Sequence, residues 1–320
     1  MRAVLFKYTE KVLSIVGLLA CAASVHANCG ASTCAINTDW ELHGASGDPG
    51  TRVDLRFEFI DQDQLRHGTE RIGIDQAQGE HKEVRTINRN WIATIDHGFD
   101  THWGVSLTLP MLGRSHTHIF DDGTTQEVEK WDFTELGDVQ VVGRYAMDRA
   151  DGENASSGIL FGVKLPTGIH SKENDAGEAA ERGLQPGSGT TDLILGGFHR
   201  WLIGDNDAFA QARWQHALQA HARFLPGDRI SLDLGYRHGV TRRLAALMQL
   251  NVVHRGHDSG ENAEAAESGG DALYLAPGVS YEVSRSARVY GLLQLPLWQR
   301  VNGVQITADR ALTIGVTTKF

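Results

Sequence analysis

The sequence lacks, after its first 27 residues, any apolar stretch that approaches the ~20 residues needed by a membrane-spanning helix. It also lacks a basic excess, because 40 acidic residues outnumber 30 basic ones and the formal net charge is −10. These two absences exclude a mature helical membrane anchor and argue against nucleic acid as a partner. There is no glycine-rich phosphate-binding loop either, and we interpret Gly189-Thr190-Thr191 as ordinary loop. With 36 glycines and 7 prolines, the composition favours many short strands over helices.

The one long apolar run lies at the N-terminus. Basic residues precede an apolar core from Val12 to Val25, and Ala27 ends a small-residue site for cleavage. This pattern predicts a secretory signal peptide over residues 1–27 and therefore export. Leu18-Leu19-Ala20-Cys21 also resembles a lipoprotein signal that would make Cys21 the lipidated first residue, but leucine at its second position fits poorly, so we favour cleavage after Ala27.

Cysteine is scarce, and the predicted export affects which role we assign to the remaining cysteines. Cleavage after Ala27 leaves two cysteines, Cys29 and Cys34, with four residues between them. In an oxidising periplasm we expect them to form a small disulfide loop within a periplasmic N-terminal segment, residues 28–50. A redox or metal-thiolate site is the alternative, but the partner ligands that it needs are missing.

The rest of the chain, residues 51–320, alternates polar and apolar residues in twelve segments. These are Arg52–Gln62, Asn90–His97, Trp103–His116, Gly137–Asp148, Gly158–Ile169, Asp192–Ile203, Asp207–Leu218, Arg229–Val240, Leu244–Arg255, Ala272–Ser284, Ala287–Val301 and Ile306–Phe320. A two-residue period is typical of strands with two different faces. Each segment is close to the ~9–11 residues that a tilted strand needs to cross a bilayer.

Short connections, such as Gly204–Asn206 and Arg285–Ser286, alternate with long polar ones, such as Asp63–Arg89, His170–Thr191 and Gly256–Asp271. A soluble β-sandwich would also alternate its residues. Charged residues in the middle of strands and this asymmetry of connections instead favour an all-β fold, a transmembrane antiparallel barrel of about twelve strands. We predict short periplasmic turns, longer extracellular loops, and outer-membrane lipid of a Gram-negative bacterium around the barrel.

Three internal motifs resemble outer-membrane proteins of the MetA-pathway-of-phenol-degradation type. They are Leu136-Gly137-Asp138-Val139-Gln140-Val141, Lys164-Leu165-Pro166-Thr167-Gly168 and Gly187-Ser188-Gly189-Thr190-Thr191-Asp192. The runs Leu275–Tyr281 and Gln294–Leu297 share the resemblance, which spans about residues 136–320. It implies a barrel that acts as a channel or transporter for small molecules.

The alternation places mixed charges on the inner wall. We predict that the solute-lining residues are Arg56, Glu58, Arg114, Asp138, Arg144, Lys164, Arg213, Asp233, Arg237, Arg288 and Arg300. Two interpretations stay open: a pore that selects its solute, or a largely closed interior whose charges pair with one another. The mixed charge argues against a purely hydrophobic solute.

Histidines gather toward the predicted outer end. His116 and His118 are in phase with Arg114, so all three should face the interior. Two imidazoles at this spacing could bind one divalent metal ion with a third ligand, for which His170, His216 and His254 are candidates. The alternative is a solvated rim of histidines without a specific role, and we expect no other cofactor.

Catalysis is not expected. A barrel lipid hydrolase would need a serine bonded to a histidine and an orienting polar group, and neither Ser106 nor Ser115 lies in such a motif. We therefore predict a passive channel or transporter-like protein for a small solute, and not an enzyme. A non-conducting structural or metal-binding barrel is the alternative, and an outer-membrane lipid hydrolase is less favoured. The oligomeric state is left open.

Overall fold

The computed structural model describes residues 49–77, 81–121, 123–147, 155–204 and 206–320. The predicted signal peptide, the choice between Ala27 and Cys21, and the Cys29–Cys34 disulfide lie outside the described residues. The same holds for the predicted periplasmic segment, apart from its last two residues. Nearly all of the described residues therefore belong to the predicted barrel region.

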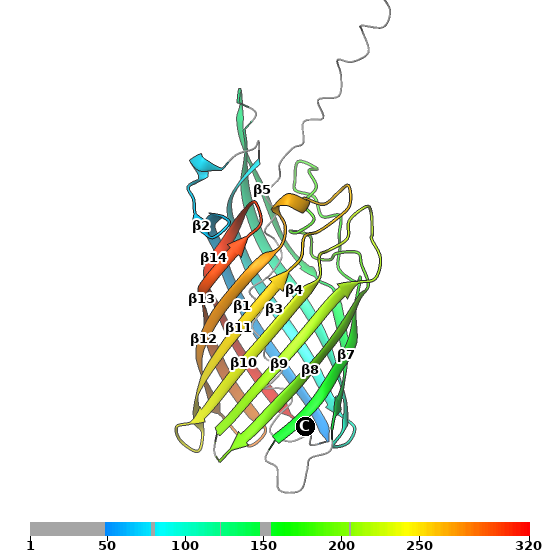
Figure 1. The fold of residues 1–320 in the computed structure, drawn as a ribbon, viewed down its shortest axis with the longest axis vertical. Coiled ribbons are helices and arrows are strands. Elements are labelled where there is room, and N and C mark those ends of the chain that lie inside the picture. The colour runs from blue at the N-terminus through cyan, green and yellow to red at the C-terminus, as the bar shows by residue number, and fades with distance from the viewer. Residues whose placement is uncertain (1–48, 78–80, 122, 148–154, 205) are drawn as a thin grey trace, which may run out of the picture.

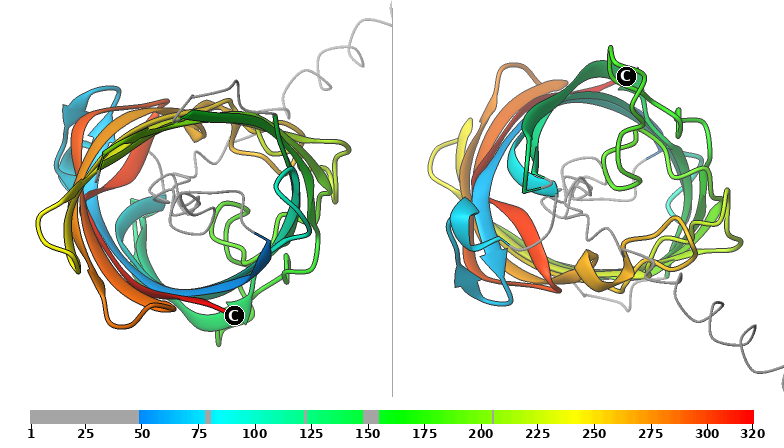
Figure 2. Two further views of the ribbon diagram at one scale, coloured as in Figure 1. Left: turned by 90° about the horizontal axis from the view of Figure 1, so that it is seen from below. Right: turned by 90° about the horizontal axis from the view of Figure 1, so that it is seen from above.

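One antiparallel sheet closes on itself and forms the wall of a barrel (Figures 1 and 2). Its long strands are β1 (Gly50–His67), β3 (His81–Gly98), β4 (Trp103–Asp121), β5 (Gln126–Leu136), β6 (Val139–Ala146), β7 (Ala155–Leu165), β8 (Asp192–Ile203), β9 (Asn206–Ala217), β10 (Arg229–Gly239), β11 (Leu244–Arg255), β12 (Gly270–Glu282), β13 (Ala287–Val301) and β14 (Val304–Lys319). Closure comes from β1 and β14, which pair from Arg52 with Lys319 to His67 with Val304.

The wall has twelve strand positions. The strand β2 (Glu70–Arg71) is only a short return from the end of β1, and β5 and β6 follow one another along the same partner, β4. Among the described residues, β5 pairs with β4 alone, whereas β6 pairs with both β4 and β7. A twelve-stranded antiparallel barrel, as the alternation predicts, is confirmed.

The two ends of the barrel differ. Short turns at one end join β3 to β4, β8 to β9, β10 to β11 and β12 to β13, and the start of β1 and the end of β14 lie there too. Long loops at the other end join β7 to β8 and β11 to β12, and the second contains a short helix, η2 (Ala265–Glu267). The green loop between β7 and β8 folds over this mouth of the ring (Figure 2).

The strand period separates an apolar outer wall from a polar inner wall. Ile230, Leu232 and Leu234 of β10 are exposed, and so are Leu293 and Leu295 of β13. Polar side chains on the opposite face, such as Asp233 and Gln294, are buried. Leu293 and Leu295 are thus not enclosed between two sheets, which excludes the β-sandwich.

One predicted loop is largely strand in the structure, and one strand was missed. The stretch Asp63–Arg89 was predicted to be a loop. In the structure β1 continues to His67 and β3 already begins at His81, so the loop between them is shorter than predicted. This loop contains a short helix, η1 (Ile74–Gln76). The strand β5 was not predicted at all. Its outward face mixes Lys130, Asp132 and Thr134 with the apolar Val128 and Leu136, and Trp131 and Phe133 are buried, so it lacks the alternation that marked the other strands.

Among the residues that the structure describes, no helix is both long enough and apolar enough to span a lipid bilayer.

Candidate functional site

Most of the predicted inner-wall residues lie inside the barrel and are paired there. Arg56 binds Glu58 at 2.9 Å and Arg144 approaches Asp96 to 3.9 Å. Farther round the wall, Asn251 donates to Asp233 at 2.6 Å. The remaining inner-wall pairs are Arg213 with Gln140, Arg237 with Asp207, and Arg288 with Glu282. Most of these pairs join opposite charges, as a largely closed interior would require.

Arg300 is the exception among the predicted interior residues. A register irregularity beside Leu273 shifts the phase of β13, so that Gln299 is buried and donates to the carbonyl of Ala308. The side chain of Arg300 is 56% exposed and lies 3.5 Å from Asp271. Its assignment to the inner wall was wrong, because a strict two-residue period cannot anticipate a bulge.

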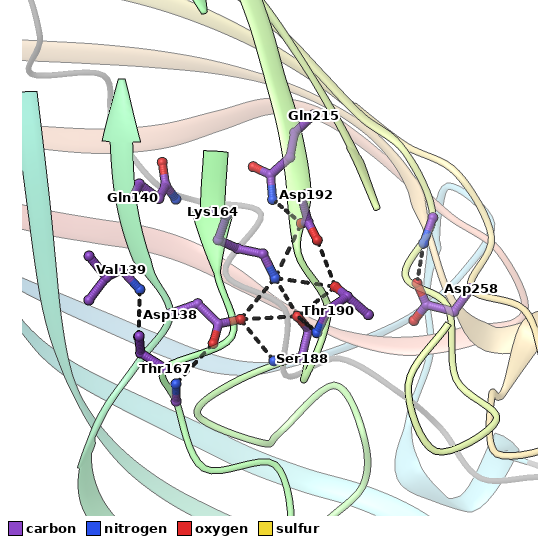
Figure 3. A network of polar contacts seen from close by, with 12 residues as sticks. Asp138, Val139, Gln140, Lys164, Thr167, Ser188, Thr190, Asp192, Gln215 and Asp258 are labelled. Atoms are coloured by element: carbon purple, nitrogen blue, oxygen red, sulfur yellow. Dashed lines mark hydrogen bonds and ion pairs between the residues drawn. The ribbon is translucent and has the colours of Figure 1, made fainter. Parts of the chain in front are cut away.

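The three internal motifs that carry the sequence resemblance meet in space (Figure 3). Asp138 lies between β5 and β6, Lys164 lies near the end of β7, and Asp192 begins β8. The Lys164 ammonium lies 2.8 Å from Asp138 and 3.2 Å from Asp192. All three side chains are buried, so each charge relies on the others rather than on water.

Hydroxyl and amide groups complete this network. Ser188 donates its backbone N–H to Asp138 at 2.9 Å, and the Ser188 hydroxyl contacts Lys164. Thr190 donates to Asp192 at 2.6 Å, and Gln215 donates to the other oxygen of Asp192, also at 2.6 Å. The expectation that Gly189-Thr190-Thr191 is ordinary loop was wrong, because Thr190 is fully buried among charged groups.

Two glycines allow the loop between β7 and β8 to close on itself at its base. A Cβ atom on Gly187 would lie 2.4 Å from the carbonyl oxygen of Gly168, and one on Gly168 would lie 2.8 Å from the Cα of Gly187. The backbones therefore touch where only glycine fits. This contact brings Ser188 beside Asp138, to which Gly168 also donates its N–H at 3.0 Å.

Beside this network lies a cavity of about 210 Å³ with a basic lining. Its charged lining residues are Arg114, Lys164, Arg182, Arg229, Arg255 and Asp192. Asp138 and Asp258 bind Lys164 and Arg255 from behind. Arg114 and Arg182 have neutral hydrogen-bond acceptors, so they give the cavity a positive charge that would attract an anion.

Backbone carbonyls hold two of these cations in place. Arg114 donates to the carbonyl of Leu184 at 2.6 Å and to Asn88 at 2.8 Å. Arg182 donates to the carbonyls of His170 and Ser188 at 2.9 and 2.8 Å, and its guanidinium lies 4.6 Å from the ring centre of Phe224. Neutral acceptors orient these guanidinium groups without cancelling their charge.

Glu181, the residue before Arg182, points into an acidic cluster instead. Its side chain is 7% exposed, and neither carboxylate oxygen has a hydrogen-bond partner among the described residues. Burial, together with the charges of Glu264, Glu83, Glu267 and Glu129, raises the pKa of Glu181. Burial and the same kind of repulsion raise the pKa of Glu264 to about 9, and burial raises that of Glu267 to about 7.

His116 and His118 both face the interior, as their phase predicts, but they have different partners. His116 shares a hydrogen bond of 2.8 Å with Thr86. His118 contacts Glu129 of β5 and lies 3.4 Å from His81 of β3. The three proposed third ligands lie elsewhere: His170 pairs with His221, His216 with Asp228, and His254 with Asp271.

Sequence reasoning missed Ser188, Thr190, Glu181 and Glu264. The first two lie in a motif that was quoted for its resemblance, so the motif itself was the available signal. The two glutamates lie in long polar loops, where nothing in the sequence separates a buried carboxylate from a solvated one. Only the folding of both loops over the mouth reveals them.

The comparisons with known proteins support the fold. No family model matches the chain, and no curated protein matches it. Among solved structures, the chain is similar to a COG4313 outer membrane channel from Pseudomonas putida F1, with 13% identity, a TM-score of 0.64, and coverage of 85% of this chain and 96% of that one. The NanC porin is more distant, with 13% identity, a TM-score of 0.44, and coverage of 84% of this chain and 100% of the porin.

Proposed function

We propose that this protein is a passive channel of the Gram-negative outer membrane for a small, hydrophilic solute that carries negative charge. The observation that carries the proposal is the basic cavity of about 210 Å³ inside a barrel whose outer wall is apolar. An apolar outer wall and a polar inner wall are what a barrel needs to place an aqueous path through lipid. The cavity adds a place where an anion would be attracted on that path.

The resemblance to the MetA-pathway-of-phenol-degradation type belongs to this proposal. Its three internal motifs build the network of Asp138, Lys164 and Asp192 that forms one side of the cavity. Charged and hydrogen-bonding groups at this place favour a polar solute over phenol or a hydrocarbon. We therefore propose kinship with that type without its aromatic solute.

A non-conducting structural barrel is the second candidate. The tight pairing of inner-wall charges, as between Arg56 and Glu58, favours it, because paired side chains fill space as well as neutralise charge. Under this proposal the cavity would be an isolated pocket and would not lie on a path for solutes through the barrel.

Planar lipid bilayers separate the two candidates. We expect the purified protein to give conductance steps. With a salt gradient across the bilayer, we expect the sign of the reversal potential to indicate that anions pass more readily than cations. Liposome swelling with small sugars and with small carboxylate anions would rank solutes by charge. Absence of both conductance and swelling would eliminate the channel, whereas cation selectivity would eliminate the anionic solute alone.

A further inference from the structure

The outer mouth holds a convergence of three potential metal ligands that the channel proposal does not use. His81 begins β3, His118 lies near the end of β4, and Glu129 lies on β5, so three neighbouring strands each supply one side chain. One ligand atom from each residue lies within 4.8 Å of the other two. We propose that His81, His118 and Glu129 bind a divalent transition-metal ion of the zinc class.

The distance between the two imidazoles suits such an ion. His81 Nδ1 and His118 Nε2 are 3.4 Å apart. Two nitrogens bound to one tetrahedral zinc are separated by about 3.3 Å, given Zn–N bonds of about 2.0–2.1 Å. The Glu129 carboxylate contacts the same His118 nitrogen, so a small movement would place an ion among all three atoms. This would leave a fourth position for water.

A buried carboxylate on the far side of the His118 ring supports the assignment. Glu181 Oε1 lies 3.9 Å from His118 Nδ1, the nitrogen that does not face His81 and Glu129. A metal-bound histidine commonly directs its other N–H to a carboxylate, which fixes the ring and strengthens the ligand. Glu181 has no hydrogen-bond partner among the described residues, so it is available for this positioning role.

The surroundings also favour a cation of this class. The ring of Trp131 lies 4.7 Å from that of His118, and the ring of Phe120 lies 4.9 Å from that of His81, so the site has apolar walls. Two imidazoles and one carboxylate form a mixed nitrogen and oxygen ligand set. Zinc, copper and nickel accept such a set, whereas calcium requires six or more oxygen ligands.

The structure changes the ligand set that the sequence predicted. His118 remains a ligand, but His116 instead shares a hydrogen bond with Thr86. The sequence placed His116 and His118 on one face correctly, yet the partners of His118 come from neighbouring strands. The site would join β3, β4 and β5 and, through Glu181, the loop between β7 and β8.

Calorimetric titration of the EDTA-treated, full-length protein in detergent with ZnCl2 tests the proposal. We expect about one equivalent to bind, an affinity loss of about 100-fold in His118→Gln and in Glu129→Gln, and about 10-fold in Glu181→Gln. His254→Gln, which alters an exposed histidine paired with Asp271, is the control and should leave the affinity unchanged. Calcium should not compete.

Two further measurements keep the test decisive. Cobalt bound in place of zinc should give the strong visible absorption of a tetrahedral site, and His118→Gln should abolish it. Heat-dependent gel migration reports whether each variant is folded, and His81→Gln replaces any His118 variant that does not fold. Zinc affinity equal in the wild type and the ligand variants, or no binding at all, would overturn the proposal. Neither result depends on conductance.

Discussion

Glu181 and Arg182 are neighbours in one loop, but their side chains lie in opposite electrostatic environments. Arg182 faces the basic cavity, where carbonyl oxygens of His170 and Ser188 accept its hydrogen bonds. Glu181 faces other carboxylates, and no hydrogen-bond partner among the described residues satisfies it. The backbone of this loop therefore separates a basic region, where buried cations have hydrogen-bond acceptors, from an acidic region whose charges repel.

The comparison shows that buried charges inside one barrel can be stabilised in two different ways. On the side of Arg182, buried charges have partners within the protein, as Lys164 has Asp138 and Asp192. On the side of Glu181, the buried carboxylates of Glu181 and Glu264 lie among other negative charges, which costs stability unless protons or a cation join them. The first region should therefore depend on its own side chains, and the second on pH and on ions.

The largest expected effect comes from breaking the paired region. Lys164→Met would leave Asp138 and Asp192 buried without their cation, and removal of one partner of a buried pair typically costs about 3–5 kcal/mol. We expect the urea midpoint of unfolding in detergent micelles, followed by tryptophan fluorescence, to fall accordingly. An unchanged midpoint would mean that water or ions replace Lys164 readily and that the network is not a buried one.

The acidic region should respond to pH in the opposite sense to an ordinary ion pair. Since the pKa of Glu264 is raised to about 9, the folded protein holds this proton more tightly than the unfolded chain does. Stability should therefore fall as the pH rises from about 4.5 to about 9. Glu264→Gln should remove that part of the fall and raise stability at pH 9 by a few kcal/mol.

Urea unfolding of the wild type and of Glu264→Gln at pH 5, 7 and 9 measures this effect. Glu267, whose pKa is raised to about 7, should contribute a smaller fall that is complete near neutral pH. If both proteins respond identically to pH, Glu264 is ionised at neutral pH and the cluster is better solvated than its burial suggests.

Ion selectivity tests the charge of the cavity directly. Arg182→Gln removes one of five lining cations while keeping hydrogen-bond donors, so we expect the ratio of anion to cation permeability to fall about two- to threefold. Arg223→Gln is the matched control, because Arg223 is exposed and paired with Glu261 outside the cavity. Equal reversal potentials in the two variants would show that the cavity does not lie on the conduction path.

The smallest expected effect comes from an exposed pair beside the same loop. Lys172 binds Glu135 at 2.6 Å, but both side chains remain about a quarter or more exposed. Lys172→Met should therefore change stability by no more than about 1 kcal/mol. A loss of stability as large as that in Lys164→Met would show that burial does not determine how much each ion pair contributes.

The alternation of residues was enough to predict the barrel, its number of strands and its two unlike ends. It failed at the bulge that turns Arg300 outward, and in β5, where polar and apolar residues mix on the outward face while Trp131 and Phe133 are buried. It could place His118 on the inner wall because strand geometry fixes that face. It could not find Glu129 or Glu181 as partners, because those contacts depend on strand register and on the fold of a long loop.

The pairing of β1 with β14 also determines when the barrel can close. Arg52 and Lys319 are partners, so the first strand waits for the last one to be synthesised before the ring can close. Until then, both edges of the growing sheet offer unpaired backbone groups to other chains. Because contacts between such distant residues form slowly, the newly made protein should need protection from aggregation during this interval. The last strand to emerge is thus the one that ends this exposure.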